Sequence, residues 1–154
     1  MKKLSMLCLG LVSIMLVTGC GSSNSKTLVC KNTQKQDGVD IGTTVSMTFK
    51  NEKINRVKMD VSTRLTGDDA KDLWSTFVEA MDGQNEEVDK DGVSMKVSKD
   101  DKKYEYTVTL DVNLDKADKD ALATYGLDEL IGDDSKLEDV KKDAEKDDFT
   151  CEVK

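Results

Sequence analysis

The sequence predicts an α+β fold, a two-layer sandwich in which a mainly antiparallel sheet carries helices on one face. Several segments alternate apolar and polar side chains, which is typical of strands that bury one face and expose the other. Other stretches carry apolar residues at helical spacing, which predicts amphipathic helices. Together these patterns predict the order β-β-β-α-β-β-α-α-β within a single globular domain at residues 27–154.

The first half of this domain is predicted to be a meander of strands followed by a helix. The expected strands cover residues 28–31, 44–50 and 56–65, with a hairpin loop at residues 51–53. The apolar stripe of the helix runs from Ala70 to Met81. We expect Thr66 or Asp68 to cap its N-terminus and Gly83 to end it.

The second half is predicted to contain a hairpin, two helices and a last strand. The expected strands cover residues 93–97, 104–112 and 149–153. Asp115 is expected to cap a short helix, because its carboxylate can accept a bond from a free backbone N–H. Ser135 and Glu138 have the spacing of a capping box, which predicts that another helix begins there.

The N-terminus has the parts of an export signal in the required order. Lys2 and Lys3 form a basic segment, and residues 4–17 form an apolar run shorter than the roughly 20 residues of a membrane span. The run ends in Val17-Thr18-Gly19-Cys20, which has the form of a lipobox. This pattern predicts a lipoprotein signal peptide at residues 1–19 and lipid attachment to Cys20. The alternative is an ordinary signal peptide followed by a chance cysteine.

The lipid anchor predicts where the domain is located. Two or more acyl chains hold a protein stably on a bilayer, so Cys20 is expected to bind it to the cell membrane on the extracytoplasmic side. Residues 20–26 are the lipidated cysteine and a flexible polar tether, whose last six residues reach only about 13 Å. The excess of lysine over arginine favours an AT-rich genome and a Gram-positive source.

The composition excludes several classes of function. The net charge of −8 becomes −10 once the signal peptide and its two lysines are removed, so bulk electrostatics disfavour nucleic acid as a partner. Histidine is absent, which removes the usual general base near neutral pH and the commonest zinc ligand. No nucleotide-binding or nucleophile motif is present. We expect a monomer that is no enzyme, with no catalytic residues and no cofactor.

Two cysteines remain in the predicted domain, Cys30 near its start and Cys151 near its end. Paired cysteines are usual in exported domains, so a structural disulfide between the first and last strands is expected. Two unpaired thiols are one alternative. A redox role is the other, although the C-x-x-C motif of redox catalysts is absent.

The chain resembles a known family in the layout of its elements. The lipobox is followed by a short strand, a hairpin around Thr44–Lys58, a helix from Asp68, and a long strand running into Asp111-Val112-Asn113-Leu114-Asp115. This arrangement is similar to the YehR-type small bacterial lipoproteins, a family of uncharacterised function. The resemblance implies no catalytic residues, and the pair Cys30 and Cys151 is not part of its pattern.

An acidic stretch suggests a calcium site. Glu87, Asp89 and Asp91 alternate and precede Gly92, as in the start of an EF-hand loop. The twelfth position of such a loop holds a bidentate glutamate, but here it is Ser98. The alternative is a solvated acidic turn.

The polar face of the sheet suggests an anion site. Arg56, Lys58 and Arg64 are predicted to point outward from one strand, and Lys96 from another. Arginine binds carboxylate and phosphate through a fork of donors. The alternative is cross-strand ion pairing, because Asp60, Glu105 and Asp111 are also predicted to point outward.

These features predict a membrane-anchored binding or interaction domain at the cell envelope. Its expected partners are the membrane, through the lipid anchor, and another envelope protein. The alternatives are a lipoprotein that binds a small ligand or calcium, and, least favoured, an enzyme.

Overall fold

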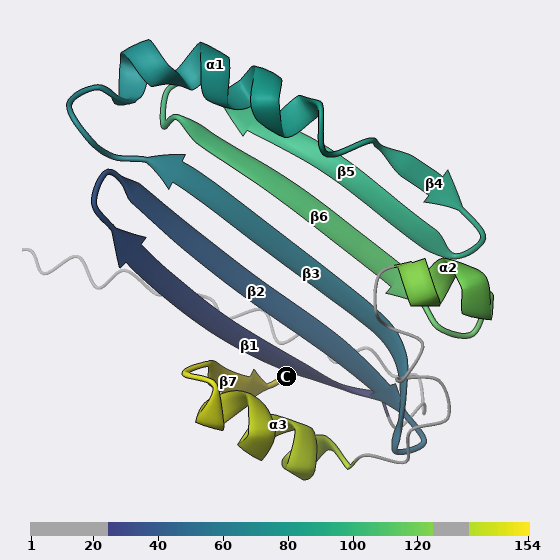
Figure 1. The fold of residues 1–154 in the computed structure, drawn as a ribbon. Helices are drawn as coiled ribbons and strands as arrows, with labels where there is room; N and C mark the ends of the chain where they lie inside the picture. The colour runs from purple at the N-terminus through teal and green to yellow at the C-terminus, as the bar shows by residue number, and fades with distance from the viewer. Residues whose placement is uncertain (1–24, 125–135) are drawn as a thin grey trace, which may run out of the picture.

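The computed structural model describes residues 25–124 and 136–154. The described residues form a seven-stranded sheet in the order β4-β5-β6-β3-β2-β1-β7 (Figure 1). All neighbouring strands are antiparallel. The strands are β1 (Ser25–Gln36), β2 (Val39–Lys50), β3 (Lys53–Leu65), β4 (Val88–Lys90), β5 (Val93–Asp100), β6 (Glu105–Asn113) and β7 (Thr150–Val153).

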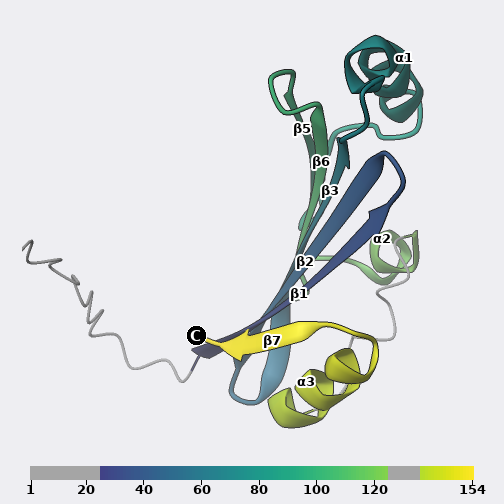
Figure 2. The same cartoon turned by 90° about the vertical axis from the view of Figure 1, so that its left-hand side faces the viewer.

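The helices of the described residues lie on one side of the sheet (Figure 2). They are α1 (Ala70–Asp82), α2 (Lys119–Thr124) and α3 (Leu137–Lys146). The fold is therefore α+β and consists mostly of sheet, in agreement with the alternation of the sequence. We call the side without helices the open face.

The first three strands are longer than their apolar patterns predict. Asp37 and Gly38 form the turn between β1 and β2, with Gly38 in the left-handed region at φ 78°. Asn51 and Glu52 form the next turn, with φ of 53° and 67°. The turn at Asn51 and Glu52, with positive φ at both positions, matches the twist of the strands. Both turns contain only two residues, so the strands pair along their full length.

β1 also begins earlier than predicted. Ser25 and Lys26 belong to the strand and pair with Lys50 and Phe49 of β2, although the sequence places them in the flexible tether. Residues 1–24, which include the predicted signal peptide and Cys20, lie outside the described residues.

Pairing between β3 and β6 joins the two halves of the chain. This register runs from Arg56 opposite Asn113 to Arg64 opposite Glu105. On its other side, β3 contains a bulge, because Thr48 faces Arg56 whereas Phe49 faces Ile54. Asn55 is the extra residue of this bulge, and bulges of this kind re-aim the side chains beside them.

The core is divided into three clusters on the helix side of the sheet. Buried residues gather under each helix instead of forming one continuous layer, because each helix is short and covers only part of the sheet. The clusters contain Leu28, Cys30, Phe49, Ile54 and Val57 beside α3; Leu65, Ala70, Trp74 and Tyr106 beside α1; and Val93, Leu110, Val112 and Leu122 beside α2.

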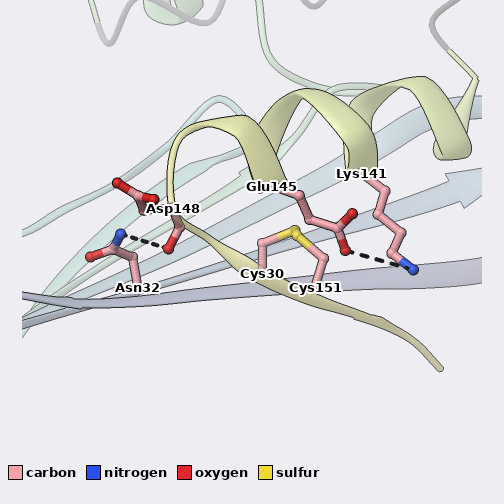
Figure 3. Close-up of a disulfide and its surroundings, with 6 residues drawn as sticks. All are labelled: Cys30, Asn32, Lys141, Glu145, Asp148 and Cys151. Carbon is pink, nitrogen blue, oxygen red and sulfur yellow. Dashed lines mark hydrogen bonds and ion pairs between the residues drawn. A yellow bond between two sulfur atoms is a disulfide. The ribbon is translucent and has the colours of Figure 1, made fainter.

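The predicted disulfide is confirmed. Cys30 of β1 and Cys151 of β7 are paired directly across the two strands, with 4.1 Å between their Cα atoms (Figure 3). The bond lies beneath α3, and Cys30 is only 1% exposed. It fastens the last strand to the first, as the sequence predicts.

The predicted order of elements is wrong at one position, because it omits β4. This strand pairs with β5 from Val88 opposite Met95 to Lys90 opposite Val93. It was missed because Val88 is the only apolar residue among the acids around it, so no alternation is visible.

The predicted helix starts also need correction. Asp69, and neither Thr66 nor Asp68, is the N-cap residue of α1, and its side chain makes no capping bond. α2 begins at Lys119, after a turn in which the Asp115 N–H donates to the Asn113 side chain. Ser135 of the expected capping box lies outside the described residues.

Candidate functional site

The open face is lined by the side chains that alternate with the buried ones. One row across the sheet contains Val29, Ser46, Lys58, Asp111 and Ser94, each opposite the next on neighbouring strands. Val29 is the exception in this row, because it is buried. Both residue type and register agree with the predicted polar face. Arg56, Lys58, Arg64 and Lys96 therefore share one face, but they are spread along its length.

Arg56 is held by a two-point ion pair. Its Nε donates to Oδ1 of Asp111 at 2.7 Å, and its Nη2 donates to Oδ2 at 2.5 Å. The hydrogen bond from Arg56, followed by its charge, lowers the pKa of the Asp111 carboxyl against the opposing effect of partial burial. The carboxylate is therefore ionised at neutral pH, and the fork of Arg56 is largely occupied.

Arg64 and Lys58, two further cations of β3, are also paired with carboxylates. Nη2 of Arg64 donates to Asp40 at 2.9 Å, on the neighbouring strand β2. Nζ of Lys58 lies 3.2 Å from Oδ2 of Asp60, whose Oδ1 accepts a hydrogen bond from the Thr109 hydroxyl. Ion pairing on the open face thus accounts for Arg56, Lys58 and Arg64 in the unliganded protein.

A hollow of about 460 Å³ lies on the open face between β3, β5 and β6. It brings together residues that the sequence had placed in different candidate sites, with Arg56 and Lys96 from the cationic set and Asp89 from the acidic stretch. Its lining residues are Arg56, Asp89, Gly92, Val93, Ser94, Lys96, Asp111, Asn113 and Lys116.

Gly92 allows the turn after β6 to form one wall of this hollow. Its φ is +80°, and a Cβ there would lie 2.8 Å from both the Lys116 Cβ and the Ala117 nitrogen. The turn is held by Asn113, whose N–H donates to the Gly92 carbonyl at 2.8 Å and whose carbonyl accepts from the Lys116 N–H at 3.1 Å. A side chain at position 92 would therefore displace Lys116.

The charges of the hollow are only partly balanced. Arg56 and Asp111 neutralise each other. Within the described residues, neither Lys96 nor Lys116 has a side-chain hydrogen-bond or ion-pair partner, and both are exposed. Asp89 contributes one further carboxylate. The hollow therefore carries a small positive excess in a strongly acidic protein.

A second hollow, of about 960 Å³, lies near the start of α3. It is lined by Phe49, Leu137 and Val153 together with charged residues of both signs. Lys26 and Lys136 are outnumbered there by Glu52, Glu138 and Asp139. This hollow has no excess of cations and contains none of the residues singled out in the sequence.

The acidic stretch is part of a β-hairpin. Asp89 lies in β4, while Asp91 and Gly92 form the turn to β5, with Asp91 at φ 51°. Oε1 of Glu87 accepts the Val97 N–H at 3.2 Å, and Asp91 lies 3.4 Å from the Lys90 Nζ. No group of three or more potential metal ligands gathers in the part of the chain that the structure describes. The calcium site stays a prediction.

The site was partly predictable from the sequence. Strand alternation places Arg56 and Lys96 on one face, but it does not reveal Lys116 or Asn113, because both belong to the end of β6 and the turn after it. Their contribution depends on the close approach of this turn to Gly92. The sequence signal that could reveal this approach is Gly92, which follows an acidic residue and which the calcium hypothesis assigns to an EF-hand loop.

Membrane attachment is not visible in the described residues. None of their helices is long and apolar enough to cross a membrane. Cys20, the predicted lipid-attachment residue, precedes the described part of the chain.

Comparisons with known proteins show a shared fold. No family model and no curated protein matches the chain. A protein from Streptococcus pneumoniae TIGR4, solved by NMR, is similar over 99% of this chain and 98% of its own, with a TM-score of 0.54 and 14% identity. The likeness is one of fold. The YehR protein of E. coli, also solved by NMR, is similar over 64% of this chain and 68% of its own, at 13% identity. Its TM-score of 0.36 carries no argument, so membership of the YehR-type family stays a prediction.

Proposed function

We propose that this protein is a lipid-anchored, non-enzymatic binding domain on the extracytoplasmic side of the cell membrane, and that it binds a ligand or envelope protein through the open face of its sheet. The observation that carries the proposal is the bare open face. The helices of the described residues lie on the opposite side (Figure 2), and the open face holds the hollow with its unpaired lysines.

The sequence supports the anchoring part of the proposal. A basic segment, an apolar run and a lipobox precede the domain in the order that lipoprotein export requires. The disulfide supports export as well, because such bonds persist mainly in oxidising compartments. The missing histidine and the absence of catalytic motifs favour binding over catalysis.

The anchoring part is tested at Cys20. We expect Cys20→Ser to abolish incorporation of labelled fatty acid and to release the protein from the membrane fraction. The matched control is Cys8→Ser, within the predicted signal peptide, which should change neither result. Unaltered membrane association of the Cys20 variant would contradict a lipid anchor.

The binding part is tested with photo-cross-linking amino acids in intact cells. One reactive residue replaces Arg64, which is exposed on the open face, and the control replaces Lys142, which is exposed on α3. We expect a discrete cross-linked product from position 64 and none from position 142. Equal labelling at both positions would contradict binding through the open face.

A further inference from the structure

We propose that the hollow beside Gly92 binds a phosphate group, which is held between the side chains of Lys96 and Lys116. This inference deepens the proposed function, on which it rests, by naming the ligand chemistry of the open face.

The first argument is the position of the two lysines. Lys96 projects from β5, whereas Lys116 is carried by the turn after β6, so the two lysines reach the same hollow from different elements. Within the described residues neither ammonium group has a hydrogen-bond or ion-pair partner, although the charge of Lys96 also helps to lower the pKa of the Asp111 carboxyl. Ser94 and Asn113 also line the hollow and supply polar groups near the lysines. A small anion placed there would satisfy charges that the protein leaves unpaired.

The second argument concerns the type of anion. A planar carboxylate is bound best by a free arginine fork, but Nε and Nη2 of Arg56 already bind Asp111. The cations that remain are lysines, which act as point charges with rotatable donors and suit the oxygens of a phosphate. Phosphate is therefore favoured over carboxylate. Asp89 lies in the same hollow and weakens the binding of any anion.

The third argument is the location of the hollow within the sheet. Arg56 and Asn113 lie in the same row as Thr27 and Thr48, close to the end of the sheet where β1 begins. The predicted anchor at Cys20 is five residues before Ser25, a distance of at most about 17 Å in an extended chain. The hollow is thus at the end of the domain nearest to the bilayer, where phosphate can come from lipid headgroups or from soluble phosphate esters.

Binding is tested by isothermal titration of the full chain, solubilised in a neutral detergent, with inorganic phosphate and with acetate. We expect saturable binding of phosphate that is tighter than binding of acetate. Lys96→Gln and Lys116→Gln should each weaken phosphate binding by about fivefold. Lys31→Gln removes the same charge from β1, outside the hollow, and should leave the affinity unchanged. Asp89→Asn should strengthen binding, because it removes a repulsive charge.

The source of the phosphate is tested by chemical labelling of lysines in the full chain reconstituted in vesicles. Lys96 and Lys116 should react more slowly when soluble phosphate is added, whereas Lys31 should not change. Protection that appears without added phosphate, and only in vesicles containing phosphatidylglycerol, would assign the ligand to the lipid headgroup.

The inference is overturned if phosphate does not bind, or if Lys31→Gln weakens binding as much as Lys116→Gln does. Weaker binding by Asp89→Asn would equally contradict it. Fluorescence of the single tryptophan, Trp74, verifies that each variant is folded. These failures would leave cross-linking from position 64 intact, whereas failure of the proposed function would remove that cross-linking as well.

Discussion

The hydroxyl of Tyr106 is the most strongly perturbed titrating group of the described residues. It donates to Oδ1 of Asp82 at 3.0 Å, while the Lys99 Nζ donates to Oδ2 of the same carboxylate at 2.6 Å. Burial, followed by the bond to Asp82, raises the pKa of Tyr106 to about 12. The hydrogen bond from Lys99 lowers the pKa of the Asp82 carboxyl. Tyrosine ionisation is therefore linked to unfolding.

We predict that alkaline pH destabilises the protein through this tyrosine. Because the folded pKa is raised above the value of about 10 in the unfolded chain, the stabilisation is complete below about pH 10 and is lost towards about pH 12. Tyr106→Phe should cost about 1 kcal/mol near pH 8, through the lost hydrogen bond, and should flatten the alkaline decline. Urea unfolding followed by Trp74 fluorescence measures both effects. An equally steep decline in the variant would contradict the prediction.

The ion pair of Arg56 and Asp111 predicts that acid, instead of alkali, lowers the free energy of unfolding. The pKa of the Asp111 carboxyl is lowered, so its stabilisation is present above the unfolded pKa and is lost as pH falls through the folded pKa. Arg56→Gln should reduce the free energy of unfolding at neutral pH by less than about 1 kcal/mol, because the arginine side chain is 57% exposed.

The difference between wild type and Arg56→Gln should disappear at the acid end of a pH series of urea unfolding curves. Arg56→Lys, which keeps the charge but loses the fork, should retain part of the stabilisation. A difference that persists at low pH would mean that Arg56 acts through packing instead.

Among the secondary-structure elements, β7 and α3 depend most clearly on a covalent bond. β7 is a four-residue edge strand, and α3 has no fully buried residue. The segment is attached by the register from Leu28 opposite Val153 to Lys31 opposite Thr150, by contacts with the cluster beside α3, and by the disulfide. A short edge element of this kind opens readily when its covalent restraint is removed.

We predict that replacing both Cys30 and Cys151 with serine lowers the free energy of unfolding by about 5 kcal/mol. The bond closes a loop with a sequence separation of 121, so its removal returns a large entropy to the unfolded chain. Urea unfolding with and without reductant measures this, and hydrogen exchange should show the β7 amides opening first. A midpoint insensitive to reductant would contradict a structural role.

The strands and α1 show which parts of the fold could be predicted from the sequence. The alternation of apolar and polar residues identified β3 and β6, because their apolar side chains, such as Val57 and Met59, face the helix side of the sheet. β1 and β2 extend beyond their apolar segments, because two-residue turns keep the strands paired. β4 was missed because its pairing is directed by the left-handed turn at Asp91 and Gly92 and not by hydrophobic pattern. The cap of α1 was misplaced because Asp69 ends the preceding turn without a side-chain bond.

For the molecule as a whole, the defining feature is a sheet assembled from distant segments. β3 pairs with β6 near the centre of the sheet, and β1 pairs with β7 at one edge. Both pairings join parts of the chain that are far apart in the sequence. Such pairings could not be derived from local pattern. The partner of Arg56 became visible only with the register of β3 and β6. The pairing of Cys30 with Cys151 was predictable because Cys8 lies in the predicted signal peptide and Cys20 is the predicted lipid-attachment residue, which leaves two cysteines in the domain.

We predict slow but simple refolding for this topology. Long-range strand pairing places folding in the millisecond-to-second range. The sequence contains no proline, so no proline-limited phase of tens of seconds should follow. Stopped-flow Trp74 fluorescence of the oxidised chain should show no phase that a prolyl isomerase accelerates. A phase that this enzyme accelerates would contradict the prediction.

The place of β7 beside β1 has a consequence for the order of events during the export proposed above. A chain that emerges N-terminus first delivers β1 long before the strand that covers its outer edge. Until residues 150–153 have been translocated, Cys30 cannot form its disulfide with Cys151 of β7. The cluster beneath α3 also lacks the C-terminal side chains that pack against it. A nascent chain arrested before this point would present a reactive thiol next to an uncovered strand. Completion of the last strand is thus the step that ends exposure to mixed disulfides and to edge-to-edge aggregation.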